Sequence, residues 1–288
     1  MESLTSWITQ ARSLLAPTLL QCLICGKNSR AAASLPGICT ICEAAIPWIR
    51  HPRCQKCGRH VGCPDCTRSS ALSPIICNRS AVAYTSVMRE MLGQYKYRGH
   101  ERLAPLLGLM LNNAYSILQK EREMSQRNRT GRQETFILPI IKKRRPASGT
   151  LWRADLFVPV PVSDSRLAER GFNQAERLGD VLSRLRGIPQ LPLLNRTHHT
   201  GKQSFKNRAE RLADMKHAFA ANPDNAVRLQ LVNLLDTVEA QDDPLQIIII
   251  DDIYTTGSTI RACAETIRTL CSSYGREVEI YSLTWARS

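Results

Sequence analysis

The chain has 288 residues, of which 43% are hydrophobic and 6% aromatic, and its formal charge is +14. This length allows one α/β domain and a smaller module, and no apolar run approaches the roughly 18–20 residues that span a bilayer. Residues 1–20 lack the features of a signal peptide, so we expect a short amphipathic lead-in helix there and a cytoplasmic protein. The positive charge favours polyanionic partners, either nucleic acid or phosphorylated small molecules.

Eight of the eleven cysteines form four Cys-x-x-Cys pairs between residues 22 and 66. The two-residue spacing lets both sulfurs of a pair face one metal ion, and eight thiolates suffice for two closed, structural zinc sites. The simplest grouping joins the first two pairs and then the last two, although an interleaved grouping is equally compatible with the spacing. The expected ligands are Cys22, Cys25, Cys39, Cys42, Cys54, Cys57, Cys63 and Cys66.

Residues 78–288 alternate apolar runs with helical patterns, which predicts a parallel β-sheet with flanking helices. We expect strands at residues 81–84, 156–160, 247–250 and 278–285. Helices are expected from about Ser86 and Glu101 and around residues 175–185 and 260–271. Residues 119–153 are strongly basic and indicate either a solvated insertion or a basic arm for nucleic acid.

The run of isoleucines at residues 247–250 leads into Asp251 and Asp252 and then into a loop of Thr, Gly and Ser. Such a loop lets backbone N–H groups and hydroxyls converge on a phosphate, and a helix beginning near Ser258 adds its positive dipole end. The two carboxylates would repel a phosphate, so we expect them to accept hydrogen bonds from ribose hydroxyls, with magnesium neutralising the site. The alternative is an ordinary turn with two exposed carboxylates. The expected phosphate-binding residues are Thr255, Thr256, Gly257, Ser258 and Thr259.

Residues 247–259 resemble the signature of type I phosphoribosyltransferases, which bind phosphoribosyl pyrophosphate (PRPP). The resemblance implies that Asp251 and Asp252 are the catalytic-site carboxylates that hold the ribose 2- and 3-hydroxyls. It also implies that the loop from Thr255 to Thr259 cradles the 5-phosphate. The fold it implies is an α/β phosphoribosyltransferase-like parallel sheet.

Basic and polar residues follow the strand expected at residues 156–160. Its prolines stop strand pairing, so the chain turns at the carboxyl edge of the sheet, where open α/β sheets bind ligands. Arginines there suit a pyrophosphate, although a salt-bridged helix start would also explain them. A polar stretch between Arg196 and Phe219 could close over a bound phosphate. It includes His198 and His199, which are further candidate site residues. The candidates for pyrophosphate or loop contacts are Lys96, Arg166, Arg170, Asn173, Gln174, Arg196, Gln203 and Arg208.

The patterns at residues 159–174 and 196–219, the string at residues 95–99 and the cysteine pairs are together similar to the ComF family (ComFC/GntX-type). Relatives often carry Asn where Asp214 stands. The resemblance fails mainly over residues 119–153 and 220–245, which therefore read as insertions. The resemblance implies a double zinc ribbon at residues 21–72, before a phosphoribosyltransferase-like domain at residues 78–288, and a role in DNA uptake during natural transformation.

Three functions remain open on this resemblance. The chain is a phosphoribosyltransferase with an unidentified acceptor, a non-enzymatic protein that binds single-stranded DNA, or a PRPP-responsive regulator. Other competence or DNA-uptake proteins are further candidate partners.

Overall fold

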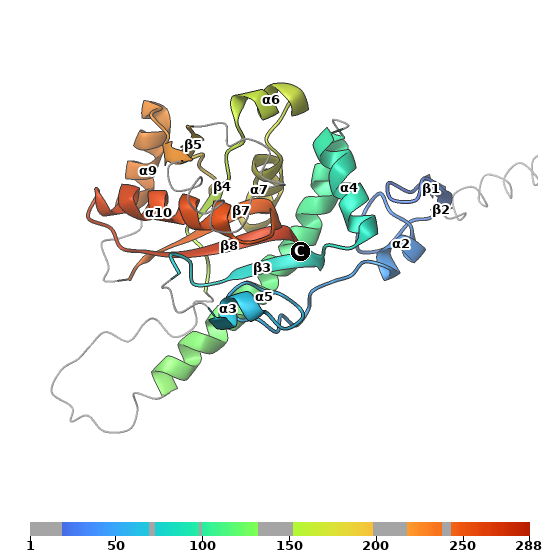
Figure 1. The fold of residues 1–288 in the computed structure, drawn as a ribbon, viewed down its shortest axis with the longest axis horizontal. Coiled ribbons are helices and arrows are strands. Elements are labelled where there is room, and N and C mark those ends of the chain that lie inside the picture. The colour runs from blue at the N-terminus through green and yellow to red at the C-terminus, as the bar shows by residue number, and fades with distance from the viewer. Residues whose placement is uncertain (1–18, 69–72, 98–99, 132–151, 198–217, 238–242) are drawn as a thin grey trace, which may run out of the picture. The chain divides into compact units, whose positions relative to one another are not determined.

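The computed structural model describes residues 19–68, 73–97, 100–131, 152–197, 218–237 and 243–288 (Figure 1). The chain divides into two compact units, one that ends at Pro47 and one that begins at Trp48. In the described ranges, no helix is both long enough and apolar enough to cross a bilayer. The boundary between the units separates the first two cysteine pairs from the last two.

Between residues 19 and 47, the described part of the smaller unit is a short hairpin followed by one helix. Its strands pair antiparallel, with Leu20 opposite Ser29. Of the lead-in helix expected over residues 1–20, residues 1–18 lie outside the described part, and the last two residues belong to the first strand. The buried apolar side chains are few and mostly small or medium, so a bound metal would supply much of the cohesion that a larger core provides. The elements are β1 (Leu19–Gln21), β2 (Asn28–Arg30) and α2 (Thr40–Ala44).

The larger unit is built on a four-stranded parallel sheet in the order β3-β8-β7-β4, which confirms the predicted fold class. Because the strands are parallel, their carboxyl ends share one edge of the sheet. The isoleucine run continues as strand through Asp251 and Asp252 to Tyr254, farther than predicted, because β8 pairs alongside it as far as Arg287. The strands are β3 (Asn78–Ala83), β4 (Leu156–Pro159), β7 (Leu245–Tyr254) and β8 (Val278–Arg287).

Helices cover both faces of this sheet, as the continuously buried isoleucines of β7 require. Ile247 and Ile249 belong to the hydrophobic cluster that includes the inner side chains of α10. Ile250 faces the other way and approaches Gly179 of α7, which packs against α5. Figure 1 shows α10 and α5 on either side of the sheet. The helical elements flanking the sheet are α4 (Ser86–Tyr97), η1 (Glu101–Leu103), α5 (Ala104–Gly131), α6 (Asp164–Arg170), α7 (Gln174–Arg186) and α10 (Ser258–Ser272).

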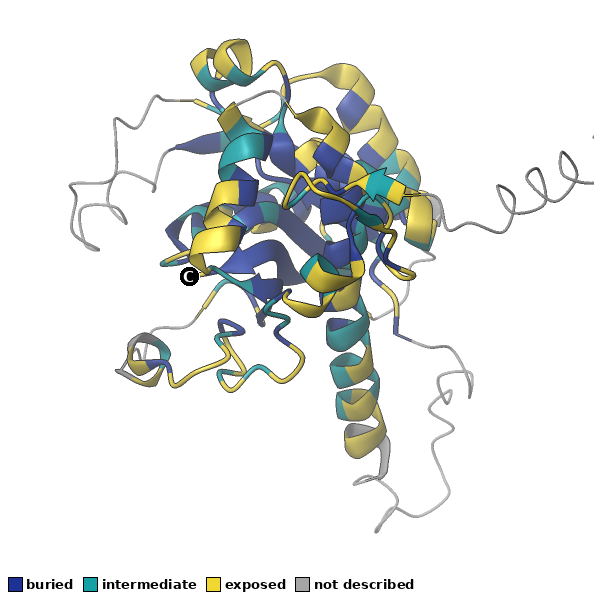
Figure 2. Cartoon of the chain, turned by 90° about the vertical axis from the view of Figure 1, so that its right-hand side faces the viewer, coloured by how far each residue is buried: buried dark blue, intermediate teal, exposed yellow. Residues whose placement is uncertain are grey.

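The basic stretch expected as an insertion at residues 119–153 begins inside helix α5. From Gln119 to Asn128 this helix has no buried side chain, so it is solvated as expected, but it is helical (Figure 2). Residues 132–151 lie outside the described part of the chain. Trp152, at the end of the stretch, is buried and its ring lies 5.3 Å from that of Tyr281 in β8.

The second expected insertion, residues 220–245, contributes to the hydrophobic core. Its helix α9 buries Val227, Leu231 and Leu235, which recur every four residues and therefore share one face. These side chains join the cluster that contains Ile247 and Ile249. With α9, a short helix and a two-stranded antiparallel sheet complete the described elements: α3 (Pro64–Arg68), β5 (Leu194–Arg196), β6 (Phe219–Ala221) and α9 (Asn225–Thr237).

Candidate functional site

The eight paired cysteines gather into two groups of four, and within each group all sulfurs lie within 4.8 Å of one another. The Sγ atoms of Cys25 and Cys39 are 4.0 Å apart, and those of Cys57 and Cys63 are 3.4 Å apart. A tetrahedral zinc ion with Zn–S bonds of about 2.3 Å separates its sulfurs by about 3.8 Å. Both groups therefore fit a structural zinc ion, and the sequential grouping is the one that forms. The first cysteine centre is Cys22, Cys25, Cys39 and Cys42; the second cysteine centre is Cys54, Cys57, Cys63 and Cys66.

The two centres share a local design that begins with a Cys-x-x-Cys-Gly turn. In each turn the glycine has a positive φ, +70° at Gly26 and +71° at Gly58, which an L side chain rarely adopts. Backbone N–H groups donate to the sulfurs, for example that of Cys57 to Cys54 Sγ at 3.5 Å. A Cβ on Gly58 would also lie 2.5 Å from the Asn78 carbonyl oxygen. The glycine after the first pair of each centre is the sequence signal that could have located these turns.

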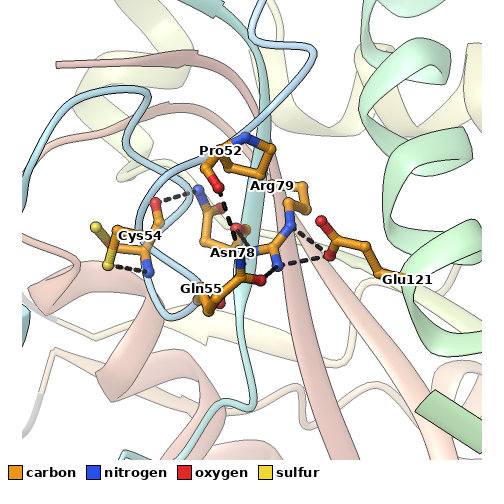
Figure 3. A network of polar contacts seen from close by, with 7 residues as sticks. Pro52, Cys54, Gln55, Asn78, Arg79 and Glu121 are labelled. Atoms are coloured by element: carbon orange, nitrogen blue, oxygen red, sulfur yellow. Dashed lines mark hydrogen bonds and ion pairs between the residues drawn. The ribbon is translucent and has the colours of Figure 1, made fainter. Parts of the chain in front are cut away.

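The second cysteine centre is tied to the sheet of the larger unit by the buried side chain of Arg79 in β3. Its guanidinium donates to the backbone oxygen of Gln55 at 3.1 Å and to Glu121 of α5 at 2.7 Å (Figure 3). Neighbouring Asn78 donates its side-chain amide to the Cys57 carbonyl at 3.2 Å. The turn that presents Cys54 and Cys57 is therefore fixed to β3 and, through Arg79, to α5.

A second buried arginine, Arg287 in β8, contacts the same centre through Cys57. It donates to the Cys57 carbonyl at 3.2 Å and to Cys57 Sγ at 3.4 Å. Burial raises the pKa of the Cys57 thiol. Hydrogen bonds from Arg287 and from the Arg59 backbone more than offset this effect and lower the pKa to about 7. Neither arginine was found from the sequence, since nothing near either residue marks it as a partner of the cysteines.

The two carboxylates at the end of β7 lie on opposite faces of the sheet, as alternation along a strand requires. Asp252 forms an ion pair with Lys96 at the end of α4, with Nζ and Oδ2 2.6 Å apart. Asp251 interacts electrostatically with Arg196 of β5 and Cys263 of α10. Burial and the neighbouring charge of Asp252 raise the pKa of Asp251 to about 7, although Lys96 opposes the shift.

The residues after β7 form a tight turn into α10, here called the anion loop (residues 255–259). Gly257 has a φ of +79° and directly precedes α10. A Cβ at Gly257 would lie 2.2 Å from the Tyr254 hydroxyl, so both the backbone and the space favour glycine. The Thr256 hydroxyl lies 3.1 Å from the Ser258 hydroxyl. Hydroxyls, backbone N–H groups and a helix N-terminus thus meet in the loop, as an oxyanion site requires.

The basic and polar candidates after β4 have two kinds of role. Asn173 caps α7 by accepting a hydrogen bond from the Ala175 N–H at 3.1 Å, and it donates to the Val160 carbonyl. Buried Gln174 accepts from Arg170 at 2.9 Å. These side chains hold the turn between α6 and α7 at the carboxyl edge of the sheet.

Arg196, in contrast, lies among other charges at the site. Burial, followed by the charge of Arg166, lowers the pKa of the Arg196 guanidinium, while Asp251 acts in the opposite direction. The structure therefore brings Lys96 and Arg196 toward the β7 carboxylates, and Arg166 toward Arg196. Gln203 and Arg208, with His198 and His199, lie outside the described residues.

No model of a known protein family matches the chain. Among curated proteins, it is 27% identical over 259 residues to "Competence protein ComFC" of Bacillus subtilis, covering 87% of this chain and 84% of that protein. It is 24% identical over 277 residues to "Competence protein ComFC" of Streptococcus pneumoniae, covering 92% and 99%. It is also 24% identical over 255 residues to "DNA utilization protein YhgH" of Escherichia coli, covering 81% and 92%. These matches over most of the chain, together with the two groups of four cysteines, support the resemblance to the ComF family.

Proposed function

We propose that the chain binds PRPP with magnesium at the carboxyl end of β7 and acts in DNA uptake or a related nucleotide process. The observation that carries this proposal is the position of Asp251 and Asp252 two residues before the anion loop, at the shared carboxyl edge of a parallel sheet. In α/β folds of this kind ligands bind at that edge. Lys96 and Arg196 add the positive charge that a polyanionic ligand needs.

Different residues of the proposed site suit different parts of PRPP. Carboxylates accept hydrogen bonds from ribose hydroxyls, so Asp251 and Asp252 suit the sugar. The N–H groups and hydroxyls of the anion loop suit the 5-phosphate. Lys96, which forms an ion pair with Asp252, would supply positive charge to a bound pyrophosphate. Magnesium, when bound, would neutralise part of the pyrophosphate charge beside these oxygen-rich groups.

The proposed role in DNA uptake is supported by the names of the relatives, two of which are competence proteins and one a DNA utilization protein. A second candidate function, direct binding of single-stranded DNA, is favoured by the formal charge of +14. Such binding weakens steeply with salt because counterions are released. The described Lys96 and Arg196 interact with the carboxylates of β7, and this pairing favours the small-ligand site as the first to test.

The proposal is tested by calorimetric titration of magnesium–PRPP into the wild type and into an Asp251→Ala/Asp252→Ala variant. We expect the double substitution to weaken binding at least about 30-fold, because it removes two charged hydrogen-bond acceptors, each of which typically contributes about 1.5–3 kcal/mol. The matched control is Asp236→Ala, which removes a carboxylate from the exposed end of α9 and should bind as the wild type does.

Unchanged affinity in the double variant would show that the site lies elsewhere. If the folded wild type binds no PRPP at all, the nucleotide proposal is wrong. A salt-dependent titration with a single-stranded oligonucleotide then becomes the decisive measurement for the second candidate. Elemental analysis of each protein for zinc verifies that the cysteine centres are intact in the comparison.

The raised pKa of Asp251 predicts that PRPP binding depends on pH near neutrality. A carboxyl group accepts ribose hydroxyls best when it is ionised, and with a pKa of about 7 its ionised fraction rises about tenfold between pH 6 and pH 8. We therefore expect affinity to increase by up to about tenfold over this range. The charged or titratable groups around Asp251 are Asp252 on β7, Lys96 on α4, Arg196 on β5 and Cys263 on α10.

The control for this pH dependence is Asp251→Asn, because the ligand's own phosphate also titrates near pH 6. The variant should retain the ligand's contribution and lose the component centred near pH 7. Identical pH profiles for the two proteins would contradict the assignment. The sign for stability is opposite: a carboxyl whose pKa is raised on folding from 3.8 to about 7 lowers the free energy of unfolding as pH rises through that interval.

A further inference from the structure

The side chain of Arg287 connects the second cysteine centre to the anion loop. It is only 3% exposed. On one side it donates to the carbonyl and the Sγ of Cys57, at 3.2 and 3.4 Å. On the other side, Nη1 donates to the carbonyl oxygens of Tyr254 and Thr255, both at 3.0 Å. A single guanidinium thus bridges a metal ligand and the first residues of the loop.

The two carbonyl contacts fix the direction of the N–H groups at the start of the anion loop. In a trans peptide, the C=O and the N–H of the same plane point in opposite directions, and the described peptide bonds are trans. Since the carbonyls of Tyr254 and Thr255 point toward Arg287, the N–H groups of Thr255 and Thr256 point away from it. The Ser288 N–H also donates to the Tyr254 carbonyl, at 3.1 Å, whereas Arg287 holds both carbonyls. Arg287 therefore helps to set the orientation of donors that the proposed phosphate site uses.

Arg287 also contacts the anion loop indirectly, through the ring of Tyr254. The Arg287 guanidinium lies over this ring, 4.9 Å from its centroid. The Tyr254 hydroxyl in turn fills the space beside Gly257, where an added Cβ would lie 2.2 Å from it. The anion loop is folded around a ring whose position depends on Arg287. Both the backbone and the side-chain contacts thus lead from the arginine to the loop.

Charge explains why the contacts of the Arg287 guanidinium should depend on the metal. Four thiolates around one zinc ion carry a net charge of about −2, and a buried guanidinium needs a compensating anion close by. With zinc present, the second cysteine centre supplies that anion through Cys57. Without zinc the thiolates are not held together and Arg287 loses its counterion, so its hold on the Tyr254 and Thr255 carbonyls weakens.

We propose that Arg287 is a positioning residue that makes the ligand-binding shape of the anion loop depend on the metal in the second cysteine centre. The zinc ion is then a structural cofactor of the PRPP site as well as of the Cys-rich segment. This inference rests on the proposed function for its ligand. The coupling between metal and loop can be measured independently of that ligand.

The test compares the wild type with Arg287→Lys, which keeps the charge but cannot bridge several acceptors as a planar guanidinium does. The matched control is Arg184→Met, at an exposed position on α7. Three measurements are made on each full-length protein. They are the rate of zinc transfer to a chromogenic chelator, hydrogen–deuterium exchange of a peptide covering residues 254–259, and the affinity for magnesium–PRPP.

For Arg287→Lys we expect at least about tenfold faster exchange in the loop, about tenfold faster zinc transfer from one of the two centres, and at least about tenfold weaker PRPP binding. Zinc removal should raise loop exchange in the wild type and add little in Arg287→Lys, since the coupling is already broken. Arg184→Met should match the wild type throughout.

The proposal is overturned if Arg287→Lys retains wild-type exchange in the loop, or if zinc removal accelerates loop exchange equally in both proteins. A wild type that binds no PRPP would refute the proposed function instead. In that case the exchange and zinc-transfer measurements still decide the role of Arg287.

Discussion

The Cys57→Ser variant is expected to lose one of two zinc ions and to lower the free energy of unfolding of the larger unit by at least about 4 kcal/mol. Structural zinc contributes apparent binding free energies of about 10–16 kcal/mol in small zinc domains, of which three remaining thiolates would retain a part. For a domain of this size, each kcal/mol shifts the Tm by about 2–4 °C, so calorimetry should show a fall of roughly 8–16 °C.

The matched control for this prediction is Cys25→Ser. Cys25 is exposed and belongs to the first cysteine centre, in the unit that ends at Pro47. This variant should also lose one zinc ion but leave the main transition of the larger unit within about 2 °C of the wild type. Equal losses of stability in the two variants would show that the centres do not differ in this way.

A second large effect is expected from Glu121→Ala. Glu121 is the anionic partner of Arg79, whose Nε lies 2.7 Å from the Glu121 Oε2, and the Arg79 side chain is only 2% exposed. Removing one member of a buried ion pair leaves an uncompensated charge and typically costs about 3–5 kcal/mol. Because Glu121 remains 25% exposed, we expect a loss of about 3 kcal/mol, measured by urea unfolding followed by circular dichroism.

Glu123→Ala is the control, because it removes the same charge two residues away on α5. Its effect should stay within about 0.5 kcal/mol, as for a surface substitution. Glu121→Ala should also speed zinc loss from the second cysteine centre, since Arg79 holds the Gln55 carbonyl between two of the ligands. A variant as stable as the control would show that the Arg79 hydrogen bonds to the backbone of this turn suffice without the carboxylate.

The parts of the site that the sequence predicted correctly are those specified locally. The Cys-x-x-Cys spacing brings two sulfurs to one ion within a single turn, and the apolar run of β7 with its following helix is read from a short window. Both groups of four cysteines and the strand–loop–helix order at Asp251 formed as expected. The predicted strand, which ended at residue 250, was too short, because the length of β7 depends on its pairing with the neighbouring strand β8.

What the sequence did not reveal is non-local. Arg287 and Cys57 are separated by 230 residues, and Arg79 and Glu121 by 42. A lone arginine in either strand carries no pattern that identifies its partner. The apolar spacing of Val227, Leu231 and Leu235 did contain a helical signal, but the segment was assigned to an insertion. The opposite placement of Asp251 and Asp252 follows from strand alternation only once both are known to lie within β7.

The position of β8 in the sheet has a consequence for how the protein is assembled. It is the latest of the four strands in sequence, yet it lies between β3 and β7. During synthesis the earlier strands therefore cannot form their final sheet until β8 is available. Contacts of such large sequence separation slow folding. The thiols of the second cysteine centre emerge early but receive Arg287 only after β8, so for most of translation they are open to oxidation or to the wrong metal. Folding yield should consequently be sensitive to zinc supply and thiol reductant while the chain is being made.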